Sequence, residues 1–152
     1  RYYLKRNNFS SGLYLNAVLS NQPFFSNYMT TMVMLPAFEP LIDSKTLFLE
    51  NYRSPNYLAL GSKNIFRLNN NLDLRLEGYL YKPWQRIVSN ENQMADNATL
   101  NEKVWPVATT ALVYSTPLGP LSLNFNYYHG ERNQFGVLFN FGYLLYNKRS
   151  LD

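Results

Sequence analysis

The sequence predicts an all-β fold, an antiparallel transmembrane β-barrel to which this chain contributes about seven strands. Three observations predict it. Several segments alternate between apolar and polar residues with a period of two, as a strand with one apolar face does. Charged residues make up only 16% of the 152 residues and aromatic residues also 16%, whereas an ordinary soluble domain is about 25% charged. The connections between the segments are alternately short and long until the last, and such alternation is typical of outer-membrane barrels.

The clearest strand covers residues 72–82, where Leu and Gly alternate with acidic, basic and tyrosine side chains. The same period is found in residues 121–128, 135–145 and 13–20, and less regularly in residues 58–68 and 107–115. Residues 28–35 are the least regular strand, because their Met and Thr content gives no clean face. No helical period is sustained, and only residues 43–51 have the pattern of a short helix, which would lie within a loop.

Six connections follow, at residues 21–27, 36–56, 69–71, 83–106, 116–120 and 129–133. The Asn-Asn-Asn and Thr-Pro-Leu-Gly-Pro segments have the composition of tight turns. We expect these turns on the periplasmic side, the long loops outside, and the last strand running inward. A strand of about 11 residues, tilted roughly 45°, spans about 25 Å, the height of the apolar band of such barrels.

Aromatic residues gather near the strand ends, where we expect interfacial girdles. The outer girdle would consist of Tyr79, Tyr81, Trp84, Trp105, Tyr127, Tyr128 and Phe135, and the inner one of Phe24, Phe25, Tyr28, Tyr114, Tyr143 and Tyr146.

The alternation assigns two faces to the barrel wall. The charged row of residues 72–82 would line a wet lumen, and the apolar rows would contact membrane lipid. The expected lumen residues on this strand are Asp73, Arg75 and Glu77. The expected lipid-facing residues are Leu72, Leu74, Leu76, Leu80, Leu121, Leu123, Phe125, Val137, Phe139 and Phe141. The alternative is a soluble β-sandwich or lipocalin-like barrel, which would place charges outside and apolar residues inside.

The chemistry of an enzyme is not evident in these residues. His129 is the only His and lies on a turn, there is no Cys, and no Gly-x-Ser-x-Gly segment presents a nucleophile. Asp73 and Glu77 are roughly 13 Å apart along one strand, too far for a paired-carboxylate mechanism. We therefore expect no catalytic residue, cofactor or metal in this segment. The net charge of +4 comes from scattered basic residues, so we expect no binding of nucleic acid.

The C-terminal third resembles a known superfamily. Residues 114–121, Tyr-Ser-Thr-Pro-Leu-Gly-Pro-Leu, are followed by a strand, a loop and residues 139–143, Phe-Asn-Phe-Gly-Tyr. These segments resemble the last hairpins of the barrel-assembly and two-partner-secretion transporter superfamily, which has a similar Ser-Pro-x-Gly-Pro-Leu turn and a terminal Phe-x-Phe-x-(Ile)-Gly strand. The positions that carry this turn and terminal-strand motif are Pro117, Gly119, Pro120 and Gly142.

Short segments elsewhere resemble one branch of that superfamily, the barrel behind patatin-like phospholipase domains in Bacteroidetes-type bacteria. They are residues 27–28, 35–40, 47–49, 52–53, 57–61, 75–79 and 142–151. The resemblance implies a sixteen-stranded barrel in the bacterial outer membrane, of which residues 1–152 are a single segment near the C-terminus. It also implies that the remaining strands and a patatin-like domain precede Arg1.

That resemblance predicts a barrel that anchors or exports a patatin-like lipid hydrolase and is not itself an enzyme. Its partners would be membrane lipid, the outer-membrane assembly machinery and the upstream patatin domain, and a homodimer is left open. Three alternatives remain. They are an assembly or secretion pore of the same superfamily, a complete small barrel of about eight strands that uses residues 2–5 as a first strand, and a soluble lipid-binding barrel.

The resemblance also singles out Arg53. The superfamily's longest loop folds into the barrel and carries a Val-Arg-Gly-Phe motif, whose Arg meets acidic residues of the wall. Residues 36–56 occupy the place of that loop, although the motif itself is absent and Arg53 is the only Arg in it. Arg53 would then pair with Asp73 or Glu77 on the next strand, because a buried Arg needs an acid nearby. The simpler interpretation is a solvated loop charge.

Overall fold

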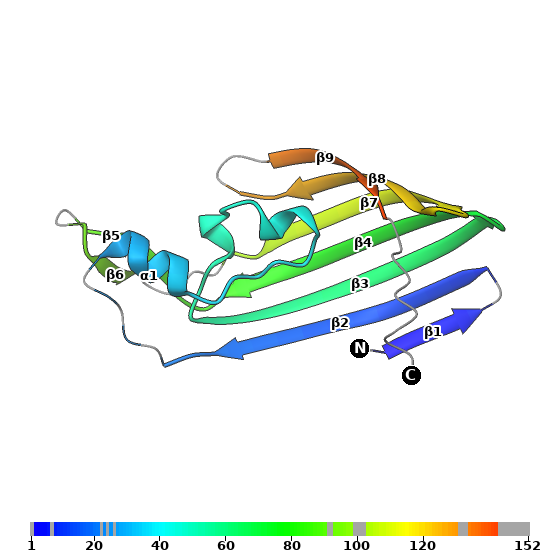
Figure 1. The fold of residues 1–152 in the computed structure, drawn as a ribbon. Helices are drawn as coiled ribbons and strands as arrows, with labels where there is room; N and C mark the ends of the chain where they lie inside the picture. The colour runs from blue at the N-terminus through cyan, green and yellow to red at the C-terminus, as the bar shows by residue number, and fades with distance from the viewer. Residues whose placement is uncertain are drawn as a thin grey trace, which may run out of the picture.

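The computed structural model describes residues 2–6, 8–21, 23, 25, 27–90, 93–98, 103–130 and 134–142. Its main element is one antiparallel seven-stranded sheet in which each strand pairs with its neighbours in the order β1-β2-β3-β4-β7-β8-β9 (Figure 1). The strands are β1 (Tyr2–Arg6), β2 (Phe9–Leu19), β3 (Asn56–Asn69), β4 (Leu72–Pro83), β7 (Trp105–Thr116), β8 (Gly119–Tyr128) and β9 (Gln134–Phe141). The predicted all-β antiparallel fold is confirmed. Over the described residues the sheet is open, with β1 and β9 as its edges.

The predicted tight turns within residues 69–71 and 116–120 are confirmed, whereas the predicted short connection at residues 21–27 is part of one long connection from β2 to β3, because residues 28–34 form a helix and not a strand. Tight turns join β1 to β2, β3 to β4 and β7 to β8, and long connections lie at the other end of the sheet. In the β7–β8 turn Gly119 has φ 140°, a left-handed conformation that favours glycine. Gly142 donates its backbone N–H to the Pro120 carbonyl at 2.9 Å. A Cβ at position 142 would lie 3.1 Å from the Pro120 ring, so the two halves of the turn and terminal-strand motif pack on each other.

One predicted strand is wrong, because residues 28–35 begin with a helix, α1 (Tyr28–Met34). The Asn27 side chain caps it by accepting a hydrogen bond from the Thr30 N–H at 3.2 Å. Met32 and Leu35 then bury their side chains against Ile87. Without an alternating pattern, this cap and this contact decide the local structure. The sheet still has seven strands, since residues 2–6 pair as β1.

The hairpin that α1 packs on was not predicted either. Its strands, β5 (Arg86–Ser89) and β6 (Ala95–Ala98), lie within the long connection between β4 and β7 and form a separate two-stranded sheet. The two strands are four residues each, so they carry too few residues for a periodic signal. Within the described ranges, no helix combines the length and the apolar character needed to cross a membrane.

The two faces of the seven-stranded sheet differ. The connection from β2 to β3 lies against one face, which we call the covered face, and carries two short 3₁₀ helices, η1 (Asp43–Lys45) and η2 (Glu50–Tyr52) (Figure 1). The predicted residues 43–51 helix is thus replaced by two 3₁₀ turns. Asp73, Arg75 and Glu77 all lie on the covered face. The opposite face, the open face, has nothing packed on it among the described residues.

The open face exposes large apolar side chains from β2 to β9. All ten residues predicted to face lipid lie on it in register: Leu72, Leu74, Leu76, Leu80, Leu121, Leu123, Phe125, Val137, Phe139 and Phe141. On β2, Leu15 is 68% exposed, and on β9 Val137 is also 68% exposed. Contiguous exposure of large apolar residues is typical of surfaces that contact another protein or a membrane.

Polar side chains on the open face satisfy each other. The Ser11 hydroxyl donates to Asn64 Oδ1 at 2.7 Å, and Asn64 Nδ2 donates to the Ser62 hydroxyl at 3.0 Å. The open face therefore presents these polar groups already hydrogen-bonded, which lowers the cost of removing them from water.

Candidate functional site

The most developed cluster of the molecule is the contact between the covered face and the 36–55 connection. The Phe38 side chain inserts into a group of tyrosines from three strands and is 2% exposed. Its ring stacks on Tyr81 with a centroid distance of 5.2 Å and makes edge contacts with Tyr57 and Tyr79 at 6.1 Å. Aromatic pairs of this geometry stabilise beyond their buried area. This cluster fixes the connection against the seven-stranded sheet, which we call the wall.

The same cluster corrects the predicted outer girdle. Tyr79, Tyr81, Trp105 and Tyr128 are buried on the covered face beneath the connection. They occupy the positions of their strands that point to the covered face. They are therefore buried although they lie near the strand ends. Of the predicted set, Tyr127 and Phe135 lie on the open face, with ring centroids 5.1 Å apart.

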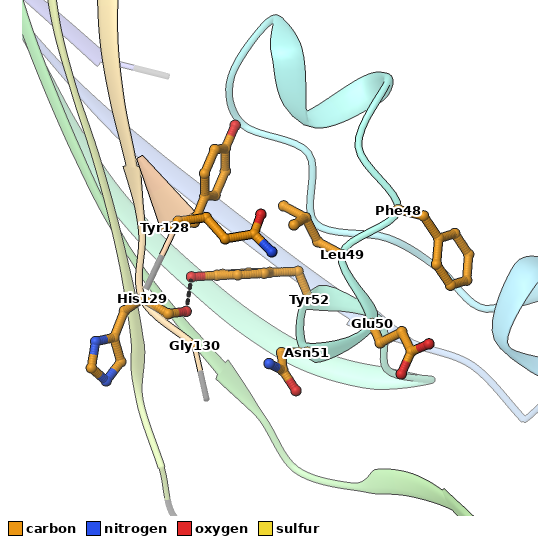
Figure 2. A pocket seen from close by; sticks show the side chains of 9 residues that line it. Phe48, Leu49, Glu50, Asn51, Tyr52, Tyr128, His129 and Gly130 are labelled. Carbon is orange, nitrogen blue, oxygen red and sulfur yellow. Dashed lines mark hydrogen bonds between the residues drawn. The ribbon is translucent and has the colours of Figure 1, made fainter. Parts of the chain in front are cut away.

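Tyr52 ties the end of the connection to the rim of the sheet. Its hydroxyl donates to the His129 carbonyl at 2.7 Å and lies 3.2 Å from the Pro106 carbonyl (Figure 2). Burial raises the pKa of the Tyr52 phenol above its ordinary value, so this group stays a neutral donor. The connection is therefore fastened to both β7 and β8.

Asp43 adds two side-chain hydrogen bonds to the same attachment. One carboxylate oxygen accepts a hydrogen bond from Asn126 Nδ2 at 2.6 Å, and the other accepts one from the Tyr128 hydroxyl at 2.5 Å. Thr109 holds Asn126 in place by donating to its Oδ1 at 2.5 Å. A carboxylate that accepts two hydrogen bonds from the wall can stabilise the docked state by about 1.5–3 kcal/mol for each bond.

The local sequence presents Asp43 to the wall. The Ser44 hydroxyl donates to the Leu41 carbonyl at 2.6 Å, which sets the η1 turn. Gly136 on β9 leaves room for the carboxylate, because a Cβ there would lie 3.3 Å from Asp43 Oδ2. This role of Asp43 was not predicted from the sequence. The available signal was an acid in the long connection opposite inward-facing amide and hydroxyl residues on residues 107–128.

Arg53 does not reach Asp73 or Glu77, so the predicted pairing is not found. Its Nη1 donates instead to the Met32 and Val33 carbonyls, at 3.2 and 3.1 Å. These are the last carbonyls of α1, which favour a cation. Arg53 thus joins the connection to the helix rather than to the wall. Its Nη2 lies 3.9 Å from Glu39 Oε1.

The two wall acids have other partners. The Lys63 ammonium lies 2.5 Å from Glu77 Oε1, and the Tyr79 hydroxyl donates to Glu77 Oε2 at 2.7 Å. Asp73 lies 3.8 Å from Arg67 Nε. Both cations sit directly across from their acids in the β3–β4 register. The wall therefore compensates these charges between its own strands.

The Arg53 geometry makes a quantitative prediction. We expect Arg53→Ala and Glu77→Gln each to lower the free energy of unfolding, and the double substitution to be additive to within about 0.5 kcal/mol, because residues without contact or shared partners do not couple. Urea unfolding of the four proteins in detergent measures this. A coupling energy of about 1 kcal/mol or more would contradict this result and support the predicted ion pair between Arg53 and Glu77.

A hollow of about 230 Å³ opens between η2 and the end of β8, lined by Glu50, Asn51, Tyr52, Tyr128 and neighbours (Figure 2). The His129 imidazole points away from it, and its Nδ1 lies 3.1 Å from the Tyr127 hydroxyl. The only His is therefore not paired with an acid in this hollow. The described part of the chain also contains no group of three or more His, Asp or Glu residues placed to hold a metal ion.

The seven-stranded sheet has an apolar open face, and its covered face carries both the charged residues of β4 and the aromatic cluster. The connection is docked on the covered face by Phe38, Tyr52 and Asp43. Comparisons with known protein families, with curated proteins and with solved structures found no match to this chain.

Proposed function

We propose that this chain is part of the wall of a membrane-embedded β-barrel, with the open face in contact with lipid and the docked connection in the lumen. The observation that carries the proposal is the opposition of the two faces. Large apolar side chains are exposed on the face on which no described residue packs, and the acidic and basic residues of β4 lie on the face that the connection covers. A soluble barrel has the reverse arrangement.

The dimensions of the strands support the proposal. The strands β2, β3, β4, β7 and β8 contain 11, 14, 12, 12 and 10 residues. Strands in globular proteins most often contain about 5–6 residues, whereas a strand that crosses a bilayer needs about 9–11. The edges β1 and β9 would have to pair with further strands, because unpaired backbone groups are not tolerated in lipid.

We extend the proposal to an outer-membrane barrel that anchors or exports a patatin-like phospholipase domain located outside these residues. The resemblance of the β7–β8 turn and the β9 strand supports it, as does the packing of Gly142 on Pro120. An assembly or secretion pore of the same superfamily is the second candidate. The connection docked on the covered face supports this candidate as well as it supports the first. A Gly-x-Ser-x-Gly segment upstream in the parent protein would distinguish the first from the second.

Because the chain contains no Cys, single-cysteine labelling tests the proposal directly. Nitroxide labels would be placed on β2 at Leu13, Tyr14, Leu15 and Asn16, and the protein reconstituted in liposomes. We expect labels at 13 and 15 to collide with oxygen dissolved in the lipid and to be protected from a water-soluble nickel chelate. Labels at 14 and 16 should collide less with oxygen in the lipid and should be less protected from the nickel chelate than labels at 13 and 15.

The contradicting results are clear. Nickel accessibility at all four positions would mean that β2 lies in water, and lipid contact at 14 and 16 would reverse the two faces. A label on Leu19, at the end of β2, serves as the control for depth. It should be less protected from the nickel chelate than a label on Leu15.

A further inference from the structure

Arg75 has a buried donor that no neighbouring group satisfies. Its Nε is inaccessible to solvent and has no hydrogen-bond partner. Among the described residues no carboxylate lies within 4 Å of its guanidinium. The two acids on the same strand pair with other cations, Glu77 with Lys63 and Asp73 with Arg67. A buried N–H of a charged group without a partner is costly. The position therefore calls for an acceptor.

A cavity of about 140 Å³ lies next to Arg75, between the wall and the connection. Residues 40–42 of the connection form one side of it. The wall contributes polar groups from four strands: Lys63 of β3, Glu77 of β4, Thr109 of β7, and Ser122, Asn124 and Asn126 of β8. Asn124 and Ser122 are already ordered by a hydrogen bond between them at 3.2 Å. The cavity thus combines one uncompensated cation with preordered polar neighbours.

Asp43 of the connection does not supply a negative charge to Arg75. Asp43 is held over β8 and β9, with one oxygen on Asn126 and the other on Tyr128. Arg75 lies on β4, which is separated from β8 by β7. Glu39, the remaining acid on this part of the connection, faces Arg53.

We propose that this cavity binds a small oxyanion, of the size and charge of inorganic phosphate, with Arg75 as its principal ligand. A guanidinium donates two parallel hydrogen bonds to such an anion, which matches the unsatisfied donor. Residues 40–42 limit the occupant to a small ion. The inference concerns the covered face and holds whether or not the open face contacts lipid.

The test is a phosphate titration of the folded protein in detergent, with ionic strength held constant by NaCl. The melting temperature is followed by circular dichroism. At phosphate tenfold above its Kd we expect a rise of about 3–6 °C. Arg75→Gln should abolish the rise. The matched variant Arg67→Gln, which removes a cation from the same face and from a surface ion pair, should keep it.

Isothermal titration calorimetry of the unmodified protein with phosphate keeps the test decisive if Arg75→Gln does not fold. Saturable binding, weakened in Arg75→Lys, which keeps the charge but loses the guanidinium fork, would support the site. No saturable binding, or an equal rise in the melting temperature in Arg75→Gln, would overturn it.

Discussion

Leu74→Arg is expected to block folding into liposomes, whereas Asp73→Asn at the adjacent position is expected to leave folding intact. Leu74 lies on the open face between Phe66 and Leu112 in the register of β3 and β7. A basic side chain on a lipid-facing strand costs about 2–4 kcal/mol near the bilayer centre. Asp73 lies on the covered face in a long, partly exposed contact with Arg67, and such a pair contributes about 0–1 kcal/mol. The fraction of heat-modifiable protein on a gel measures folding.

A second site guards against a local effect at Leu74. Val137 on β9 is also exposed on the open face, so Val137→Arg should reduce folding in the same way. Normal folding of both Arg variants with loss of folding in Asp73→Asn would contradict the assignment of the faces. Improved solubility of Leu74→Arg without detergent would favour the soluble lipid-binding barrel.

The two faces could be predicted from the sequence because the side-chain period of a strand is two. The row Asp73, Arg75 and Glu77 is enough to fix which side of β4 is polar, and cross-strand register carries that assignment to β3 and β7. The turn at residues 116–120 was predictable for a similar reason. Pro and Gly restrict the backbone locally, so their effect does not depend on distant contacts.

The docking of the connection could not be predicted, because it depends on contacts between residues far apart in the sequence. Asp43 meets Tyr128 across 85 positions, and no periodic pattern encodes that meeting. The strand predicted at residues 28–35 was wrong for a related reason, because their side chains suit either a strand or a helix. The Asn27 cap and the contact with Ile87 select the helix. Arg53 was assigned a wall partner by analogy, but the carbonyls of α1 lie closer.

Phe38→Ala is expected to release the connection from the wall while the sheet stays folded. The ring packs among Tyr57, Tyr79 and Tyr81, and truncation of such a buried Phe costs about 3–5 kcal/mol. The connection itself opens locally, because a docked segment can detach at a lower free energy than global unfolding. Trypsin cleavage after Lys45 reports the open population. We expect the cleavage rate to rise about a hundred-fold or more, since each 1.4 kcal/mol corresponds to tenfold.

Phe48→Ala is the matched control, because the same side chain is removed from the same connection at a position that is 44% exposed. Its main contact is the Arg53 guanidinium over the ring at 4.7 Å, so its cleavage rate should change by about tenfold or less. Equal rates in the two variants would show that the aromatic cluster does not hold the connection. Loss of the folded band in Phe38→Ala would show instead that the sheet and the connection fold as one unit, in which case the docked connection contributes to the stability of the sheet and is not a separable insert.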